Sequence, residues 1–245
     1  MFHRRTLLAL VALLAAAISA PEPASATICP TSPILRRAEG TRPANIGDLK
    51  AQLLNYKCFG TYDREVKQVF VRAQAYLERR AGRVSKPAIV FDLDETSLSN
   101  WAAILANDFG YIPGGSCKEL PDGPCGWTAW EEAGSAKVIG PARDLFDAAK
   151  TKGVAIFFIT GRHEKVRAAT EANLRTAGYD GWKELIMRPD GSRTPSAADY
   201  KAPERGKIQA QGYTIIVNIG DQLSDLAGGF ADRTFKVPNP FYLIP

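Results

Sequence analysis

Two aspartates and a threonine follow one short hydrophobic segment of this 245-residue chain. The apolar residues 89–91 lead directly into Asp92, Asp94 and Thr96, each two positions from the next. A carboxylate held beside a metal ion can attack phosphorus, and a second one can transfer a proton. The alternative interpretation is a solvated turn, because a short motif gains its meaning from its structural context.

Two later hydrophobic segments also end in polar residues. The clusters that follow them are Thr160, Gly161 and Arg162 after residues 156–159, and Gly220, Asp221 and Asp225 after residues 215–219. If the three segments are parallel strands, their carboxyl ends share one edge of a sheet, where open α/β sheets bind ligands. Three such clusters are hard to explain as unrelated turns, so they favour a site at that edge.

Together the three clusters resemble the motifs of the haloacid dehalogenase (HAD) superfamily of phosphohydrolases. Their local forms are similar to those of subfamily IIIB, which includes acid phosphatases and plant vegetative storage proteins. The similarity runs from about residue 46 to residue 226. It implies an acid phosphatase that hydrolyses small-molecule phosphate monoesters.

The resemblance also implies roles for individual residues. Asp92 would be the nucleophile that forms an aspartyl-phosphate, and Asp94 would protonate the leaving alcohol and then activate water. Mg²⁺ is the implied cofactor, because its ligands would all be oxygens. These ligands would come from Asp92, Asp94 (through its backbone carbonyl), Asp221 and Asp225, the last either directly or by orienting a metal-bound water. Substrate contacts would come from Thr96, Thr160, Gly161 and Arg162.

Some of these residues have a second interpretation. Arg162 fits a structural ion pair as well as a phosphate contact, and the adjacent His163 fits a surface position at a helix start. A lysine should balance the charge of the site, and the family places one upstream of the Gly-Asp motif. Lys201 fits that position better than Lys207, because a helix starting at Pro203 would leave Lys201 beside the carboxyl edge of the sheet.

Alternating helix and strand patterns predict an α/β fold with a doubly wound, Rossmann-like parallel sheet. The resemblance makes this a HAD-type sheet with N-terminal helices, in one domain over residues 27–245. The predicted strands are residues 88–93, 154–159, 185–187 and 213–219. The predicted helices are residues 46–56, 61–81, 141–152, 164–177 and 203–211, with caps from Asn45 and Thr61 on the first two.

Residues 97–137 lie where the superfamily carries its cap. The segment is too short for a separate domain, so we expect a small cap insertion and an open site. Trp101, Trp127 and Trp130 fall in this segment. They fit either core packing or the lining of a substrate entrance.

The N-terminus has the pattern of a signal peptide over residues 1–26. A basic start is followed by an apolar run over residues 7–18 and by the small residues Ala24, Ser25 and Ala26. This predicts a secreted or periplasmic protein without a membrane anchor after cleavage.

Export implies an oxidising compartment, in which the four cysteines should pair. Cys29, Cys58, Cys117 and Cys125 allow three connectivities. The short Pro- and Gly-containing segment between Cys117 and Cys125 favours their pairing, which leaves Cys29 with Cys58.

The formal net charge of +5 is spread along the chain without a block of lysine or arginine. Nucleic acid is therefore not expected as a structural partner. Two alternatives to hydrolysis stay open: a storage or interaction protein without turnover, and a phosphotransferase that uses the same residues. The presence of Asp92, Asp94, Asp221 and Asp225 favours an enzyme.

Overall fold

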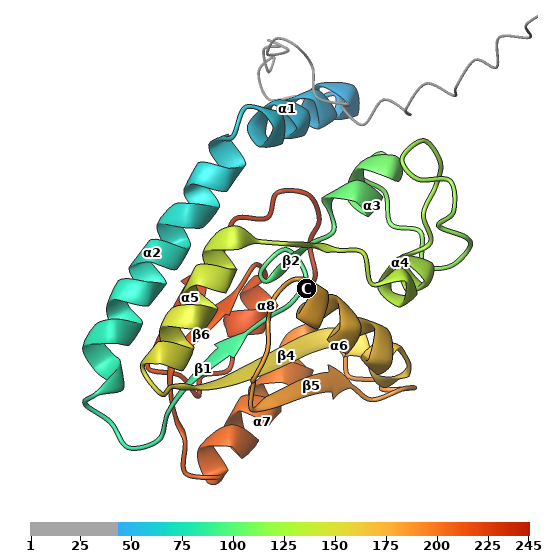
Figure 1. Cartoon of the computed structure of the whole chain (residues 1–245). Helices are drawn as coiled ribbons and strands as arrows, with labels where there is room; N and C mark the ends of the chain where they lie inside the picture. The colour runs from blue at the N-terminus through green and yellow to red at the C-terminus, as the bar shows by residue number, and fades with distance from the viewer. Residues whose placement is uncertain (1–43) are drawn as a thin grey trace, which may run out of the picture.

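Five parallel strands form the central sheet of the computed structural model, which describes residues 44–245. Their order is β5-β4-β1-β6-β7, and every neighbouring pair runs parallel (Figure 1). The strands are β1 (Pro87–Phe91), β4 (Ala155–His163), β5 (Glu184–Arg188), β6 (Thr214–Gly220) and β7 (Arg233–Lys236). Sequence analysis missed β7, because Phe235 is the only buried residue of this edge strand and no apolar run marks it.

Side chains along the strands alternate between two hydrophobic cores. Ile89 and Phe91 of β1 join one core, and Ala88 and Val90 join the other. Helices α2 (Thr61–Ala81), α5 (Gly140–Thr151) and α6 (Arg167–Thr176) contribute to the first core, and α7 (Ala197–Ala210) contributes to the second. The predicted doubly wound parallel sheet is thus confirmed.

The chain reverses its direction of winding between β1 and β6. It passes from β1 outward to β4 and β5, and then returns through α7 to β6, which lies beside β1. The carboxyl ends of β1 and β6 therefore flank a topological switch point, the usual ligand site of an open α/β sheet.

Helix α7 begins earlier than the sequence predicted. Ser196 caps it by accepting a hydrogen bond from the backbone amide of Asp199, and Pro203 lies inside the helix. The expectation that Pro203 starts the helix is wrong, because the Ser196 cap fixes the first turn and a later proline removes only one backbone donor. Lys201 is consequently the fifth residue of α7 and does not precede it.

Most other predicted helices keep their positions. Asn45 caps α1 (Ile46–Cys58) through the amide of Gly47, as expected. Helix α2 instead starts after Gly60, without a side-chain cap from Thr61. The predicted helix over residues 164–177 divides into the 3-10 turn η1 (Glu164–Val166) and α6.

The cap insertion is a small structure over the carboxyl edge of the sheet. It contains α3 (Trp101–Ala106) and α4 (Trp127–Ala133) and is framed by the antiparallel pair β2 (Leu98–Ser99) and β3 (Lys137–Val138). Cys117 and Cys125 form the predicted disulfide within it. The pairing predicted for Cys29 and the signal peptide over residues 1–26 lie outside the described residues.

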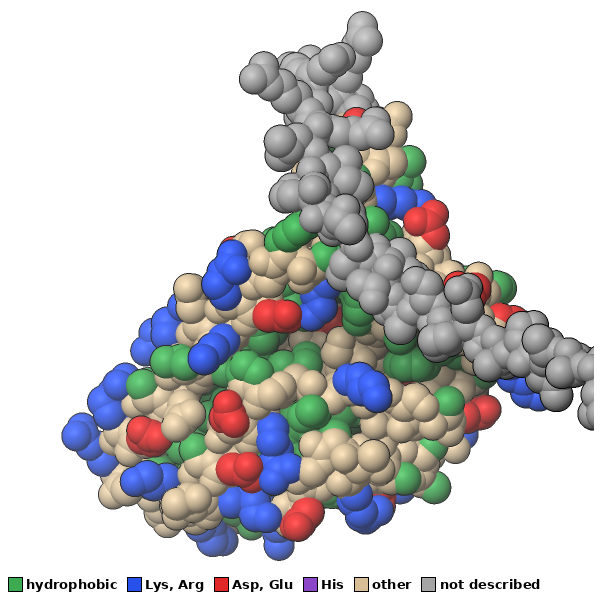
Figure 2. Space-filling model, turned by 45° about the horizontal axis from the view of Figure 1, so that its top comes forward, with side chains coloured by type: hydrophobic (Ala, Val, Ile, Leu, Met, Phe, Trp, Pro, Cys, Tyr) green, Lys and Arg blue, Asp and Glu red, His purple; other side chains and the backbone are tan. Residues whose placement is uncertain are grey.

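The surface of the described chain carries mixed charge. On the face shown in Figure 2, acidic and basic side chains are interspersed around a hollow lined partly by hydrophobic residues. No helix within residues 44–245 combines the length and hydrophobicity needed to cross a bilayer.

Candidate active site

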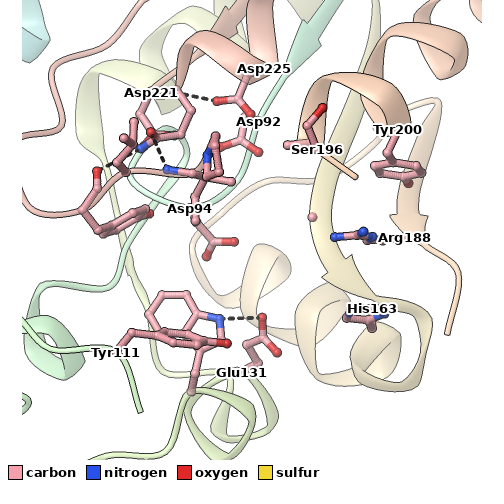
Figure 3. A pocket seen from close by; sticks show the side chains of 18 of the residues that line it. Asp92, Asp94, Tyr111, Glu131, His163, Arg188, Ser196, Tyr200, Asp221 and Asp225 are labelled. Atoms are coloured by element: carbon pink, nitrogen blue, oxygen red, sulfur yellow. Dashed lines mark hydrogen bonds between the residues drawn. The ribbon is translucent and has the colours of Figure 1, made fainter. Parts of the chain in front are cut away.

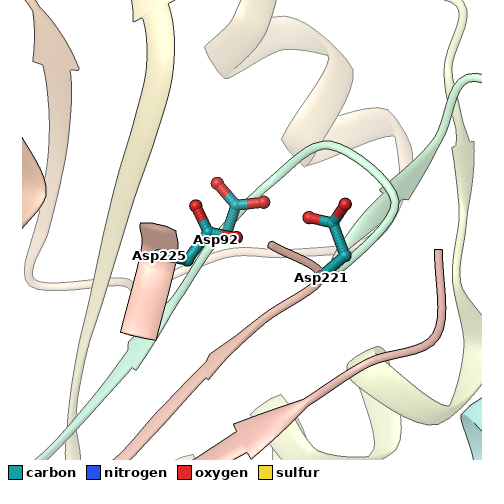
Figure 4. A group of neighbouring side chains, drawn as sticks. All are labelled: Asp92, Asp221 and Asp225. Atoms are coloured by element: carbon teal, nitrogen blue, oxygen red, sulfur yellow. The ribbon is translucent and has the colours of Figure 1, made fainter. Parts of the chain in front are cut away.

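Three buried aspartates meet at the switch point. Asp92 follows β1, Asp221 follows β6, and Asp225 lies in the short helix α8 (Leu223–Leu226), as Figure 4 shows. One carboxylate oxygen from each lies within 4.8 Å of the others. Gly220 permits this approach, because a Cβ there would come within 2.5 Å of the Asp225 Cβ. The site thus offers a compact set of oxygen ligands.

Lys201 supplies a positive charge to this cluster. Its Nζ donates to one oxygen of Asp92 and one of Asp225, each at 2.6 Å, and the side chain is buried. Burial opposes the charged lysine, but the two carboxylates outweigh it and raise its pKa. Lysine at this position therefore remains an ammonium group.

One ammonium does not neutralise three carboxylates. Burial raises the pKa of the Asp92 carboxyl well above its ordinary value, against the opposing effect of Lys201. Burial and the charge of Asp225 likewise raise the pKa of Asp221 to about 7. A divalent cation would supply the missing charge, and an all-oxygen ligand set suits Mg²⁺. The residues present therefore fit the predicted metal.

Asp94 is paired separately from the cluster. Arg162 Nη2 donates to it at 2.7 Å, and Arg162 Nε contacts both its oxygens at 3.1 and 3.2 Å. Asn100 Nδ2 adds a hydrogen bond at 2.9 Å. Although burial acts to raise the pKa of the Asp94 carboxyl, Arg162 and Asn100 lower it overall. Of the two interpretations of Arg162, the structure contains the ion pair.

The other sequence-predicted residues lie around these groups. Thr160 is buried, and its Oγ1 accepts a hydrogen bond from the Arg162 amide at 3.1 Å. Gly161 lines the pocket. Thr96, predicted as a substrate contact, is fully buried and donates to Asp221 Oδ1 at 3.2 Å. His163 lies on the pocket rim, with Nδ1 3.3 Å from the Pro189 carbonyl oxygen.

Arg205 anchors the segment that carries Asp225. It is fully buried and donates to the backbone carbonyls of Asp225, Ala227 and Gly229. Sequence analysis assigned no role to Arg205. Its position four residues after Lys201, on the same face of a helix, is the signal that could have placed it beside the site.

Glu95 and its partners were missed by the sequence analysis. Glu95 has a positive φ of 51° and is buried, and it accepts hydrogen bonds from the Asn100 amide and the Tyr242 hydroxyl at 2.6 and 2.5 Å. Burial raises its pKa to about 7. These bonds tie the loop after β1 to the C-terminal tail, residues 237–245.

The tail also contacts the aspartate cluster directly. Asn239 Nδ2 donates to Asp221 Oδ2 at 2.7 Å, and Gln222 Nε2 donates to the same oxygen at 2.6 Å. The Ile244 amide donates to Gln222 Oε1, and Ser224 donates to the Ile244 carbonyl. No local pattern marked Asn239, because its partner lies 18 residues away and on another element.

A pocket of about 580 Å³ opens above Asp92 and Asp94. The cap contributes Tyr111 and Glu131, which Figure 3 labels, and Trp127. The tail contributes its last five residues. The Trp127 indole donates to Glu131 at 3.0 Å. Burial, followed by the charge of Asp94, raises the pKa of Glu131 to about 7.

The three tryptophans of the cap were expected either to pack in the core or to line the substrate entrance, and the structure contains both cases. Trp127 lines the pocket, whereas Trp130 is buried and donates to Asn100 Oδ1. Trp101 packs against Phe109 and Phe241.

Known proteins with similar sequences are plant acid phosphatases and related proteins. Acid phosphatase 1 of Solanum lycopersicum is 33% identical over 185 residues, which cover 75% of this chain and 69% of that protein. The stem 28 kDa glycoprotein of Glycine max is 37% identical over 178 residues, or 71% and 67% of the two chains. Vegetative storage protein 2 of Arabidopsis thaliana is 30% identical over 207 residues, or 84% and 74%.

The fold has a counterpart among solved structures. The class C acid phosphatase of Bacillus anthracis with tungstate bound superposes with a TM-score of 0.62 at 23% identity, covering 80% of this chain and 86% of that one. The family model of the HAD superfamily, subfamily IIIB (acid phosphatase), matches residues 19–245. The chain therefore belongs to this family of phosphomonoester hydrolases, as the motifs at the sheet edge indicated.

Proposed function

We propose that the protein hydrolyses phosphate monoesters through an aspartyl-phosphate on Asp92, with Mg²⁺ held by Asp92, Asp221, Asp225 and the backbone carbonyl of Asp94. The observation that carries this proposal is the arrangement around Lys201. Three buried carboxylates lie together, and Lys201 pairs with two of them, Asp92 and Asp225, while Asp94 is paired separately with Arg162. Two carboxylates in unlike environments can perform unlike roles.

In the first half of the reaction the Asp92 carboxylate attacks phosphorus. A bond forms between a carboxylate oxygen and phosphorus, and the bond from phosphorus to the ester oxygen breaks. When bound, Mg²⁺ would favour the ionised form of Asp92 and offset the charge of the phosphate. Thr160 and the amide of Gly161 would hold phosphate oxygens.

Asp94 would give its proton to the leaving alcohol. Its lowered pKa in the free protein means that it is ionised before substrate binds. A phosphate dianion close by would raise that pKa, since like charges favour the protonated carboxyl. Asp94 would thus gain its proton as the substrate arrives.

In the second half Asp94 acts as a base. It would accept a proton from water, and the resulting nucleophile would attack phosphorus and release the Asp92 carboxylate. An acceptor alcohol in place of water would make the same protein a phosphotransferase. Release of inorganic phosphate, measured with and without added alcohol, separates the two reactions.

The decisive experiment is phosphate release from a panel of monoesters, with and without EDTA. We expect chelation to abolish activity and Mg²⁺ to restore it. Asp92→Asn should have no turnover, because an amide does not attack phosphorus, while Asp122→Asn on the exposed cap surface is the control. Full activity without metal would contradict the assignment of Mg²⁺, and turnover by Asp92→Asn would contradict that of the nucleophile.

We further propose that the protein acts outside the cytoplasm after removal of residues 1–26. The support is the basic, apolar and small-residue pattern of that segment. N-terminal sequencing of the exported protein should find a start near Thr27. A mature protein that retains Met1 would contradict this proposal.

A further inference from the structure

Two buried polar atoms beside the pocket have no hydrogen-bond partner. Within residues 44–245 they are Arg188 Nε and Tyr200 Oη, and no other buried side-chain nitrogen or oxygen lacks a partner there. Both residues line the pocket that contains Asp92 and Asp94. Because buried polar groups are nearly always satisfied, two exceptions on residues of one pocket mark this wall as a place where the chain leaves hydrogen-bonding capacity unused.

Hydrogen bonds hold Arg188 in place but occupy only some of its N–H donors. It ends β5, and its Nη2 donates to the carbonyl and hydroxyl oxygens of Thr194 at 2.8 and 2.7 Å. A guanidinium carries five N–H donors, so donors remain for an anion. In the part of the chain that the structure describes, Arg188 forms no ion pair.

The position of Arg188 places it near the phosphate-binding residues proposed above. In the register of β4 and β5, Met187 pairs with Thr160 and Arg188 pairs with His163. Adjacent strands lie roughly 5 Å apart. A group bound at Arg188 would therefore be a neighbour of the reacting phosphate within the same pocket.

Two further features make this side of the pocket positive. Lys165 lines the pocket with an exposed side chain, and it makes no ion pair within residues 44–245. The N-terminus of α7, at Ser196, also lies on the pocket wall and presents the positive end of the helix dipole.

Acidic residues nearby offset this charge only partly. Asp199 lies in the first turn of α7 and accepts a hydrogen bond from Ser196. Asp190 lies 3.9 Å from His163 on the rim, and Glu164 is paired with Arg167. None of these acids forms a salt bridge with Arg188 or Lys165.

Acidic and basic side chains are unevenly placed around the pocket. Arg188 and His163 lie across the cavity from Asp221 and Tyr111 (Figure 3), while the charge of Lys165 acts on Glu131 and opposes the rise in the pKa of that carboxyl. We propose that Arg188 and Lys165 form a second anion subsite, so that the preferred substrates are phosphomonoesters whose alcohol carries a further phosphate or carboxylate. This inference rests on the proposed function and specifies its substrate class.

The test compares substrates that differ by one anionic group. For a carboxylate, the pair is 3-phosphoglycerate and glycerol 3-phosphate; for a phosphate, it is fructose 1,6-bisphosphate and fructose 6-phosphate. We expect kcat/KM to favour the doubly anionic member of at least one pair by about tenfold or more, the size of one charged hydrogen bond. Equal values within both pairs would overturn the proposal.

Variants then show which residues cause the preference for a second anionic group. Arg188→Gln should reduce the ratio of the two kcat/KM values toward one. Lys165→Gln, at an exposed position where folding is not at risk, should reduce it in the same direction. Arg193→Gln is the matched control, because it removes the same charge from the exposed segment that follows β5 but does not line the pocket. An equal effect of Arg193→Gln would show diffuse charge and refute a subsite.

Binding to Asp92→Asn separates this inference from the proposed mechanism. Calorimetry with the inactive variant should show tighter binding of fructose 1,6-bisphosphate than of fructose 6-phosphate, and Arg188→Gln in the same background should remove the difference. A binding preference without any turnover by the unmodified protein would support the subsite and contradict the proposed function. Turnover by the unmodified protein without this binding preference would support the proposed function and contradict the subsite.

Discussion

The carboxyl edge of the sheet and the elements that cover it build the same pocket in different ways. At the edge, Asp92 and Asp221 follow β1 and β6 directly, and Thr160 lies near the end of β4, so strand register brings the three residues together. The cover, defined as residues 97–137 of the cap and the tail of residues 237–245, depends on contacts between distant segments. Tyr242, for example, bonds to Glu95 across 147 residues. The edge therefore supplies chemistry, and the cover supplies enclosure and support.

After loss of the nucleophile, the largest effect should come from Asp94, the proton-transfer residue at the edge. Asp94→Asn should slow turnover by about 10²–10⁴-fold, the usual range for a general acid and base. Esters with good leaving groups need less protonation, so the loss should be smaller for nitrophenyl phosphate than for an alkyl phosphate. Steady-state kinetics on both esters measure this, and equal losses would exclude Asp94 as the acid.

The next effect should come from the charge that balances the edge. Lys201→Met should reduce turnover by roughly 10²–10³-fold, as for removal of one stabilising donor from an active site. Lys207→Met is the matched control, since Lys207 is exposed and, within residues 44–245, its ammonium group pairs with Glu204 alone. Phosphate release at saturating Mg²⁺ is the measurement. If Lys207→Met were inactive and Lys201→Met kept normal turnover, Lys207 would be the charge-balancing lysine instead.

The support that the cover gives to the metal site should be smaller. Asn239→Ala removes the hydrogen bond from the tail to Asp221. We expect Mg²⁺ affinity to fall by about 10–100-fold, as is typical for residues that orient metal ligands. Calorimetric titration with Mg²⁺ measures this, with the exposed Gln209→Ala as control. Unchanged affinity would mean that the tail only encloses the pocket.

The smallest effect concerns the stability of the cover rather than catalysis. The pKa of Glu131 is raised from 4.5 to about 7 by burial and by Asp94. The folded chain therefore holds this proton up to about pH 7, whereas the unfolded chain releases it near pH 4.5. Stability from this group is present at low pH and is lost as the pH rises through that interval.

The substitution Glu131→Gln should remove this loss of folding stability at higher pH. Relative to the unmodified protein, the variant should gain about 1–3 kcal/mol of unfolding free energy between pH 4 and pH 8. Chemical denaturation across this pH range gives the difference. Glu132→Gln, on the exposed face of the same helix, is the control. A pH-independent difference would show that Glu131 does not titrate in the folded state.

The same contrast explains what the sequence could reveal. The sheet, its helices and the three aspartates were predictable, because alternation of apolar runs and strand-end polar clusters are local signals. The start of α7 was missed because Pro203 is a strong helix-start signal, whereas Ser196 is a weaker one. Asn239, Tyr242 and Arg188 gain their roles only through tertiary packing, which no local pattern encodes.

Helix α7 also links two parts of the site mechanically. Lys201 and Arg205, one turn apart, both hold the segment of Asp225, through its carboxylate and its backbone carbonyl respectively. The sheet holds the same residue, because Asn218 of β6 donates to the Asp225 backbone carbonyl at 3.1 Å. Lys201 in turn donates to Asp92, which follows β1. Helix α7 is therefore fastened to two strands of the sheet through the aspartates that its lysine neutralises, so a substitution that loosens α7 would disturb the nucleophile and Asp225 together.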